Sequence, residues 1–172
     1  FLYAWKNKLN VVVVILAVIV FFMSVRIVRQ YERGVVLRFG RLHNVREPGI
    51  RFIFPIVDVM IKVPLRIVTL PIQSQGIITK DNVTVGVSAV AYYRVVDPVK
   101  SVIAIENVRS AIDQIAQTTL RKVVGQHHLD ETLSDTAALN VNIREILDVT
   151  TVDWGVEVTL VELKDILLPD SM

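Results

Sequence analysis

The sequence predicts an α+β domain attached to the cytoplasmic end of an N-terminal transmembrane helix. An uncharged apolar run covers residues 9–25, and a period-two pattern over 83–95, with an apolar residue at every second position, is typical of a strand with one buried face. Apolar residues at helical spacing then fill much of 99–154, before a final strand-like segment. Strands, then helices, then a returning strand indicate an α+β domain. About 145 residues follow the anchor, enough for one domain with its own core.

The uncharged run is long enough to anchor the chain in a bilayer. As a helix it spans about 25 Å, slightly less than a hydrocarbon core, and Lys8 and Arg26 can reach the headgroups from its two ends. A signal peptide would be followed by a small-residue cleavage site, but Ser24, Val25 and Arg26 follow here. A core helix without a polar stripe would need a much larger protein around it. The predicted anchor residues are Val11, Val14, Ile15, Leu16, Val18, Ile19, Phe21 and Phe22.

Charge is distributed unevenly along the chain. From residue 26 to 66 there are nine Lys/Arg against three Asp/Glu, a balance of +6, whereas from 67 onward there are eight against 14, a balance of −6. A basic membrane-proximal part and an acidic main body fit anionic lipid rather than nucleic acid. The arginine excess after the anchor predicts a cytoplasmic domain. Arg38 is expected on a solvated strand face, and the predicted anionic-lipid contacts are Arg26, Arg29, Arg33 and Arg41.

After the anchor, the sequence predicts a strand, a loop and then a stretch, residues 50–58, that has two interpretations. Residues 31–40 form a strand that ends at Gly40, and a loop through His43 and Asn44 leads to a turn at Pro48-Gly49. Residues 50–58 are bulky and aromatic but broken by charge and proline. They fit a buried strand and an interfacial wedge equally well. The wedge residues would be Phe52, Ile53, Phe54 and Ile56.

The central part of the chain predicts two further strands. Residues 59–70 read as a strand interrupted by Pro64, which places it at a sheet edge. A tight turn at Asp81-Asn82 precedes the alternating strand of 83–95, in which every second residue from Val83 to Val95 faces a core.

Three helices and a strand complete the chain. Asp97 and Pro98 begin a short helix, a longer one over 108–123 stops at Gly125, and Ser134 or Asp135 caps a third that carries Trp154. The final strand over 156–168 changes phase after Leu160, which predicts a bulge.

No catalytic or metal-binding pattern is present. There is no Cys, which excludes thiolate metal sites, Cys nucleophiles and disulfides within these residues. Nucleotide-binding, nucleophile-elbow and zinc-protease motifs are missing, and the cluster of His127 to Glu131 has the spacing of a solvated loop. Asp113 lies mid-helix without a partnered His or Ser. The sequence therefore predicts no enzyme, cofactor or metal site.

Several motifs resemble the stomatins, or slipins, within the prohibitin–flotillin (SPFH, or band 7) superfamily. They occur in the order found in that family and cover nearly everything after the anchor. They are residues 31–41 (YERGVVLRFGR), 48–50 (PGI), 78–83 (ITKDNV), 93–95 (YRV), 116–121 (AQTTLR) and 153–156 (DWGV).

The resemblance implies a single-pass protein of the cell membrane. Residues 1–28 would be the anchor and 29–172 an SPFH domain, an antiparallel sheet with packed helices, with a membrane-proximal part (29–70) and a membrane-distal part (71–172). It also implies that residues 48–58 contact the membrane, which favours the wedge. Animal stomatins carry a palmitoylated Cys in the segment that matches 55–58, and this chain has none.

The implied function is a non-enzymatic scaffold that assembles into large rings or cages and organises membrane microdomains. Its implied partners are membrane lipids, further copies of the chain and, in prokaryotes, a membrane protein of the NfeD type. The alternative is a regulatory subunit of a membrane protease. The family's long helical C-terminal region is not among the 172 residues, so the natural chain is expected to continue.

Overall fold

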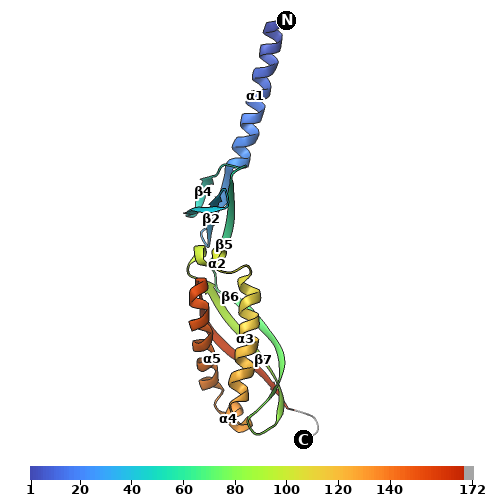
Figure 1. The fold of residues 1–172 in the computed structure, drawn as a ribbon, viewed down its shortest axis with the longest axis vertical. Helices are drawn as coiled ribbons and strands as arrows, with labels where there is room; N and C mark the ends of the chain where they lie inside the picture. Colours follow the sequence, from blue (N-terminus) through green and yellow to red (C-terminus); the bar gives the residue numbers. More distant parts are fainter. Residues whose placement is uncertain (169–172) are drawn as a thin grey trace. The chain divides into compact units, whose positions relative to one another are not determined.

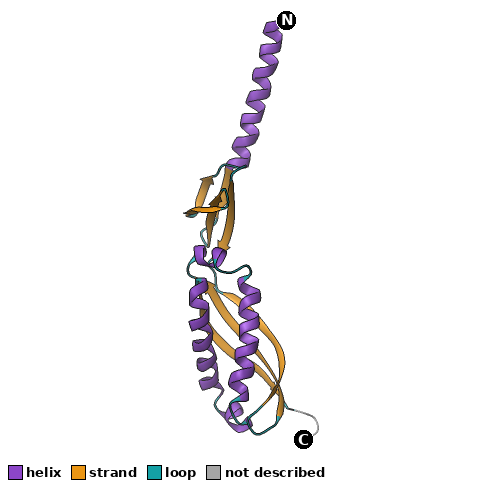
Figure 2. Ribbon diagram, viewed as in Figure 1, coloured by secondary structure: helices purple, strands orange, loops and turns teal. Residues whose placement is uncertain are grey.

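The computed structural model describes residues 1–168 and divides the chain into two compact units, residues 1–64 and 65–172. Figures 1 and 2 show the helices and strands of both units. The division of the chain at residues 28 and 70 into anchor, membrane-proximal and membrane-distal parts stays a prediction.

Unit 1 (residues 1–64) consists of one long helix, a two-stranded ribbon and a three-stranded sheet. Helix α1 covers Leu2–Ser24, and β1 (Val25–Val28) follows it without a break. The ribbon pairs β1 antiparallel with β4 (Gly49–Phe52). The sheet has the order β3-β2-β5, formed by Arg41–Arg46, Glu32–Arg38 and Asp58–Pro64. The buried apolar side chains of this unit are few: Val28, Val35, Val36, Ile53 and Val63.

Two expectations for unit 1 are wrong. The segment around His43 and Asn44 is not a loop but strand β3, which pairs with β2 because a two-residue turn at Phe39-Gly40, both at positive φ, reverses the chain. The strand expected over residues 59–70 is two strands. It ends at Pro64, at the edge of its sheet as expected, and the chain resumes in the second unit as β6 at Val68.

Unit 2 (residues 65–172) packs helices on one face of the antiparallel sheet β6-β7-β8. Its strands are β6 (Val68–Ile78), β7 (Thr84–Val95) and β8 (Val156–Leu167). Alternate residues of β7, from Val85 to Tyr93, are buried as predicted, and the turn before this strand has Asn82 at φ 61°. The core combines these residues with one side of α3 (Val108–Gly125) and of α5 (Thr136–Thr151).

The predicted helix starts are present, but only one predicted cap makes a side-chain hydrogen bond. The Asp97 carboxylate accepts the backbone N–H of Val99 at the start of α2 (Pro98–Ile103). Asp135 is at the N-cap of α5, but its side chain makes no capping hydrogen bond. The side chain of Asn107, which was not predicted as a cap, accepts the N–H of Ser110 at the start of α3. Residues after His128 are not loop: they form the short helix α4 (Leu129–Ser134). The third predicted helix ends at Thr151, and Trp154 lies in the 3-10 turn η1 (Val152–Trp154).

Gly155 connects the end of the helices to the start of β8. Its φ is 69°, and its carbonyl accepts the backbone N–H groups of Val96 and Asp97 at 2.8 and 3.0 Å. A Cβ at this position would lie 2.9 Å from the Lys100 Cβ and closer still to the Asp97 carbonyl. Position 155 therefore requires glycine for two reasons: the backbone has a positive φ, and the backbone of Asp97 leaves no room for a Cβ. The predicted change of phase in β8 is present as a register shift between Val158 and Leu160.

Candidate functional site

Helix α1 is the one described helix that is long and apolar enough to cross a membrane. Its 23 residues extend about 34 Å. All eight predicted anchor residues lie on it, and none of its residues is buried by the rest of unit 1. Because an apolar helix this exposed would be unstable in water, its surface is suited to lipid.

The end of α1 is attached to the segment that follows β4. The Phe21 and Phe52 rings lie 6.0 Å apart, centroid to centroid. The Ser24 hydroxyl donates a hydrogen bond to the Ile53 carbonyl, and the Ile53 N–H donates to the Ser24 carbonyl at 2.9 Å. The segment 52–54 is thus held at the C-terminal end of the membrane helix.

The structure separates the four predicted wedge residues into two groups. Phe52, Phe54 and Ile56 are exposed, Ile56 at 91%, whereas Ile53 is 5% exposed and belongs to the interior of unit 1. Two exposed apolar residues of the ribbon, Ile27 and Ile50, were missed by the sequence argument. They lie opposite each other across the ribbon, and only the pairing of β1 with β4 brings them together.

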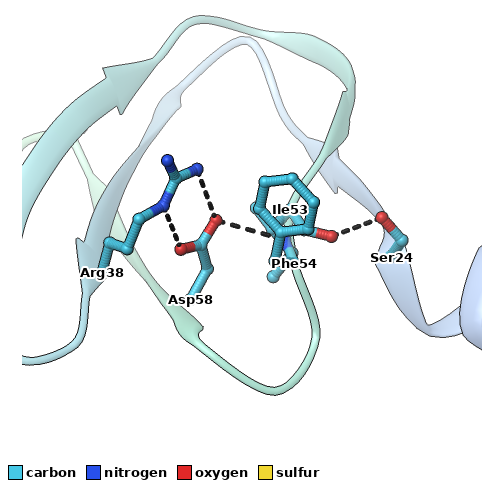
Figure 3. A network of polar contacts seen from close by, with 5 residues as sticks. All are labelled: Ser24, Arg38, Ile53, Phe54 and Asp58. Carbon is cyan, nitrogen blue, oxygen red and sulfur yellow. Dashed lines mark hydrogen bonds and ion pairs between the residues drawn. The ribbon is translucent and has the colours of Figure 1, made fainter.

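A partly buried ion pair between Arg38 and Asp58 fixes the loop that carries Phe54 and Ile56 (Figure 3). Arg38 Nε lies 2.8 Å from Asp58 Oδ1, and Asp58 Oδ2 accepts the backbone N–H of Phe54 at 3.1 Å. The Asp58 side chain has no solvent-exposed surface, and the Arg38 guanidinium also lies 5.1 Å from the centre of the Phe54 ring. The expectation that Arg38 lies on a solvated strand face is therefore wrong. The sequence did not indicate the ion pair because Asp58 is 20 residues away.

Electrostatics keep this ion pair intact near neutral pH. The hydrogen bond from Arg38 is the largest influence that holds the pKa of Asp58 below its usual value, and the Phe54 N–H acts in the same direction. Burial opposes them by raising the pKa, but the net shift is downward. The carboxylate is thus ionised, and it holds both the strand residue Arg38 and the loop residue Phe54.

The four predicted lipid-contact arginines lie at different places in unit 1. Arg29 donates to the Tyr31 hydroxyl at 2.6 Å, Arg33 donates to the carbonyls of Gln30 and Glu32, and Arg41 is exposed at the start of β3. Arg26 is on the ribbon and donates to the Val25 carbonyl. Within residues 1–168, none of these four has a carboxylate within 4.0 Å.

The polar clusters of unit 2 have structural roles. His127 contacts the Val123 carbonyl at 2.7 Å, and Asp81 accepts the N–H of Leu129, which joins the β6–β7 turn to α4. Asp113 is half-buried and accepts a hydrogen bond from Gln117. In the described part of the chain, no three His, Asp or Glu side chains converge on a position that would suit a metal ion.

A membrane-spanning helix joined to a ribbon with exposed apolar side chains, followed by an α+β unit, defines a membrane-associated protein. The family model for the SPFH domain / Band 7 family matches residues 26–172, and the chain belongs to this family. Membership supports a membrane-associated role of the scaffold type.

Relatives named as stomatins extend this result. The chain is 48% identical over 161 residues to a stomatin homolog of Pyrococcus horikoshii, covering 93% of this chain and 60% of that protein. It is 43% identical over 152 residues to Stomatin-1 of Caenorhabditis elegans, covering 88% of this chain and 46% of that protein. An uncharacterized protein of Archaeoglobus fulgidus is 52% identical over 159 residues, covering 92% of this chain and 64% of that protein. The chain therefore spans about half to two thirds of these relatives.

Proposed function

We propose that this chain is the membrane-binding and self-associating part of a non-enzymatic scaffold that organises lipids or membrane proteins. In this proposal α1 crosses the bilayer once, and the ribbon with the following loop inserts shallowly into the near leaflet. Unit 2 lies in the cytoplasm and contacts further copies of itself.

The observation that carries the proposal is the contact of Phe52 with Phe21. Phe21 lies in the last turn of α1, so a ring that packs on it lies at the edge of the hydrocarbon core. The neighbouring exposed side chains Phe54 and Ile56 are on a loop that the ion pair of Arg38 and Asp58 holds in place. Burying one such side chain in lipid contributes about 1.5–3 kcal/mol.

We expect a fluorescent label at position 56 to report a lipid environment. Because the chain has no Cys, Ile56→Cys provides a single site for an environment-sensitive dye in the full chain reconstituted in liposomes. Its emission should shift to the blue, and brominated lipids should quench it, because the side chain lies below the headgroups. The same dye at Asp130→Cys, exposed on α4, should show neither effect. A dye at position 56 that behaves like the dye at 130 would contradict membrane insertion of the loop, while Val18→Cys confirms that the anchor is inserted.

We also expect the domain after the anchor to face the cytoplasm, because arginines are in excess after Val25. Ser74→Cys and Ser134→Cys place single thiols at exposed positions of unit 2. Both should react with a membrane-impermeant reagent only after the cells are lysed. Labelling in intact cells would reverse the orientation and would favour the alternative function, a regulatory subunit of a membrane protease.

Self-association is supported by exposed surfaces of unit 2 that complement each other. Val141, Val149 and Val152 are exposed on one side of α5 and its continuation η1. Exposed carboxylates lie on α4 and α5, whereas the exposed charges of α3 are all cations. The carboxylates are Asp130, Glu131 and Glu145, and the cations are Arg109, Arg121 and Lys122. A contact between different surfaces of neighbouring copies closes into a ring when the rotation between copies allows it.

A further inference from the structure

Two arginines lie directly opposite each other in the ribbon next to the membrane helix. In the antiparallel pairing of β1 with β4, Arg26 is the cross-strand partner of Arg51. Both side chains are half-buried. Because side chains alternate along a strand, they share a face with Val28, which is 2% exposed and packs into unit 1.

Nothing in the described residues neutralises this pair. Arg26 donates to the Val25 carbonyl at 3.3 Å, and Arg51 donates to the Glu47 carbonyl, not its carboxylate, at 3.1 Å. Neither has an acidic partner within 4.0 Å among residues 1–168. Like charges directly opposite each other in a sheet are destabilising. Each guanidinium has five N–H donors, and the hydrogen bond described above uses one of them. The ribbon therefore holds two adjacent cations with free donors.

The position of the pair indicates which anion it meets. Arg26 is two residues after the last residue of α1, at the depth where lipid phosphates lie if α1 spans the bilayer. The other face of the ribbon carries Ile27, Ile50 and Phe52, all exposed and apolar. A ribbon with one apolar face and two opposed cations on the other suits the boundary between acyl chains and headgroups.

We propose that Arg26 and Arg51 form a two-pronged site that binds the phosphate of an anionic membrane lipid. Two guanidinium groups donate to one phosphate, and its negative charge relieves their repulsion. An anionic lipid such as phosphatidylglycerol binds better than phosphatidylcholine, whose own cation offsets the phosphate charge. This inference rests on the membrane interface proposed above, and it adds Arg51 and a defined chemistry to it.

Thermal unfolding of the full chain in a neutral detergent tests the site. Short-chain phosphatidylglycerol should raise Tm more than short-chain phosphatidylcholine or inorganic phosphate at equal concentration. Arg26→Gln or Arg51→Gln should weaken the binding of phosphatidylglycerol by about tenfold or more. Lys62→Gln is the matched control, because it removes the same charge from an exposed position on β5 of the same unit that is not a predicted lipid contact. It should retain the lipid response.

The effect of Arg26→Gln on Tm should change sign when lipid is added, and this distinguishes a lipid site from a purely structural role. Without lipid, Arg26→Gln should raise Tm, because it removes the repulsion from Arg51, whereas in phosphatidylglycerol the same change should lower it relative to the natural chain. Equal loss of the phosphatidylglycerol response in Arg26→Gln and Lys62→Gln would overturn the site in favour of a general charge effect. An equal effect of inorganic phosphate would show a free-anion site instead. If the dye at position 56 reports lipid while phosphatidylglycerol has no selective effect, the membrane interface stands and the arginine site fails.

Discussion

Replacing Gly155 with alanine destabilises unit 2 by about 3 kcal/mol, since the change adds strain at positive φ to overlap with the backbone of Asp97. The neighbouring backbone cannot move away easily, because the N–H groups of Val96 and Asp97 both bind the Gly155 carbonyl. Guanidinium unfolding followed by Trp154 fluorescence measures the loss. A Trp5→Phe background leaves Trp154 as the single tryptophan.

Gly76→Ala is the control for this substitution. Gly76 lies on β6 of the same sheet at ordinary φ, and a Cβ there would meet no atom within 4 Å. Its free energy of unfolding should change by roughly 0.5 kcal/mol or less. Equal guanidinium midpoints for Gly155→Ala and Gly76→Ala would show that the close approach of the Asp97 backbone to Gly155 does not limit stability.

The second large effect concerns assembly. The double variant Val149→Asp with Val152→Asp should convert oligomers of the full chain into monomers, because it places two charges in the exposed apolar stripe of α5. Losing about 2–3 kcal/mol of apolar burial per contact weakens association by roughly 30-fold to 150-fold. Mass photometry in native membrane discs, at low and high salt, measures the particle size.

The matched control is Ile103→Asp, which makes an equally exposed apolar position acidic at the end of α2. It should leave the oligomers intact. High salt should loosen the natural assembly in part, since charged contacts around the stripe are screened while apolar contacts are not. A natural chain that stays monomeric or dimeric at every salt concentration, extended to the full length of its relatives, would contradict the scaffold proposal.

Local patterns in the sequence predicted the elements whose signals are local. The alternation over 83–95, the cap at Asp97 and the stop of α3 at Gly125 each depend on residues a few positions apart. Strand β3 and the division after Pro64 were missed because pairing partners, not composition, determine them.

The candidate site shows the same limit. Composition left residues 50–58 open between a buried strand and a membrane wedge, and it did not distinguish buried Ile53 from exposed Ile56. Arg38 was placed in solvent because its partner Asp58 follows a loop and two further strands. The opposed arginines at 26 and 51 become neighbours only through the register of the ribbon.

The attachment of Phe52 to Phe21 has a consequence for the bilayer itself. The uncharged part of the anchor, residues 9–25, is slightly shorter than a typical hydrocarbon core, which creates hydrophobic mismatch. A free helix adjusts its tilt and depth independently, but here the ribbon must move with the end of the helix. If α1 spans the bilayer, we expect the surrounding lipid to thin wherever Lys8 and Arg26 do not close the gap by reaching to the headgroups. Many subunits side by side would share one thinned patch, which would sort lipids and proteins according to the length of their apolar segments.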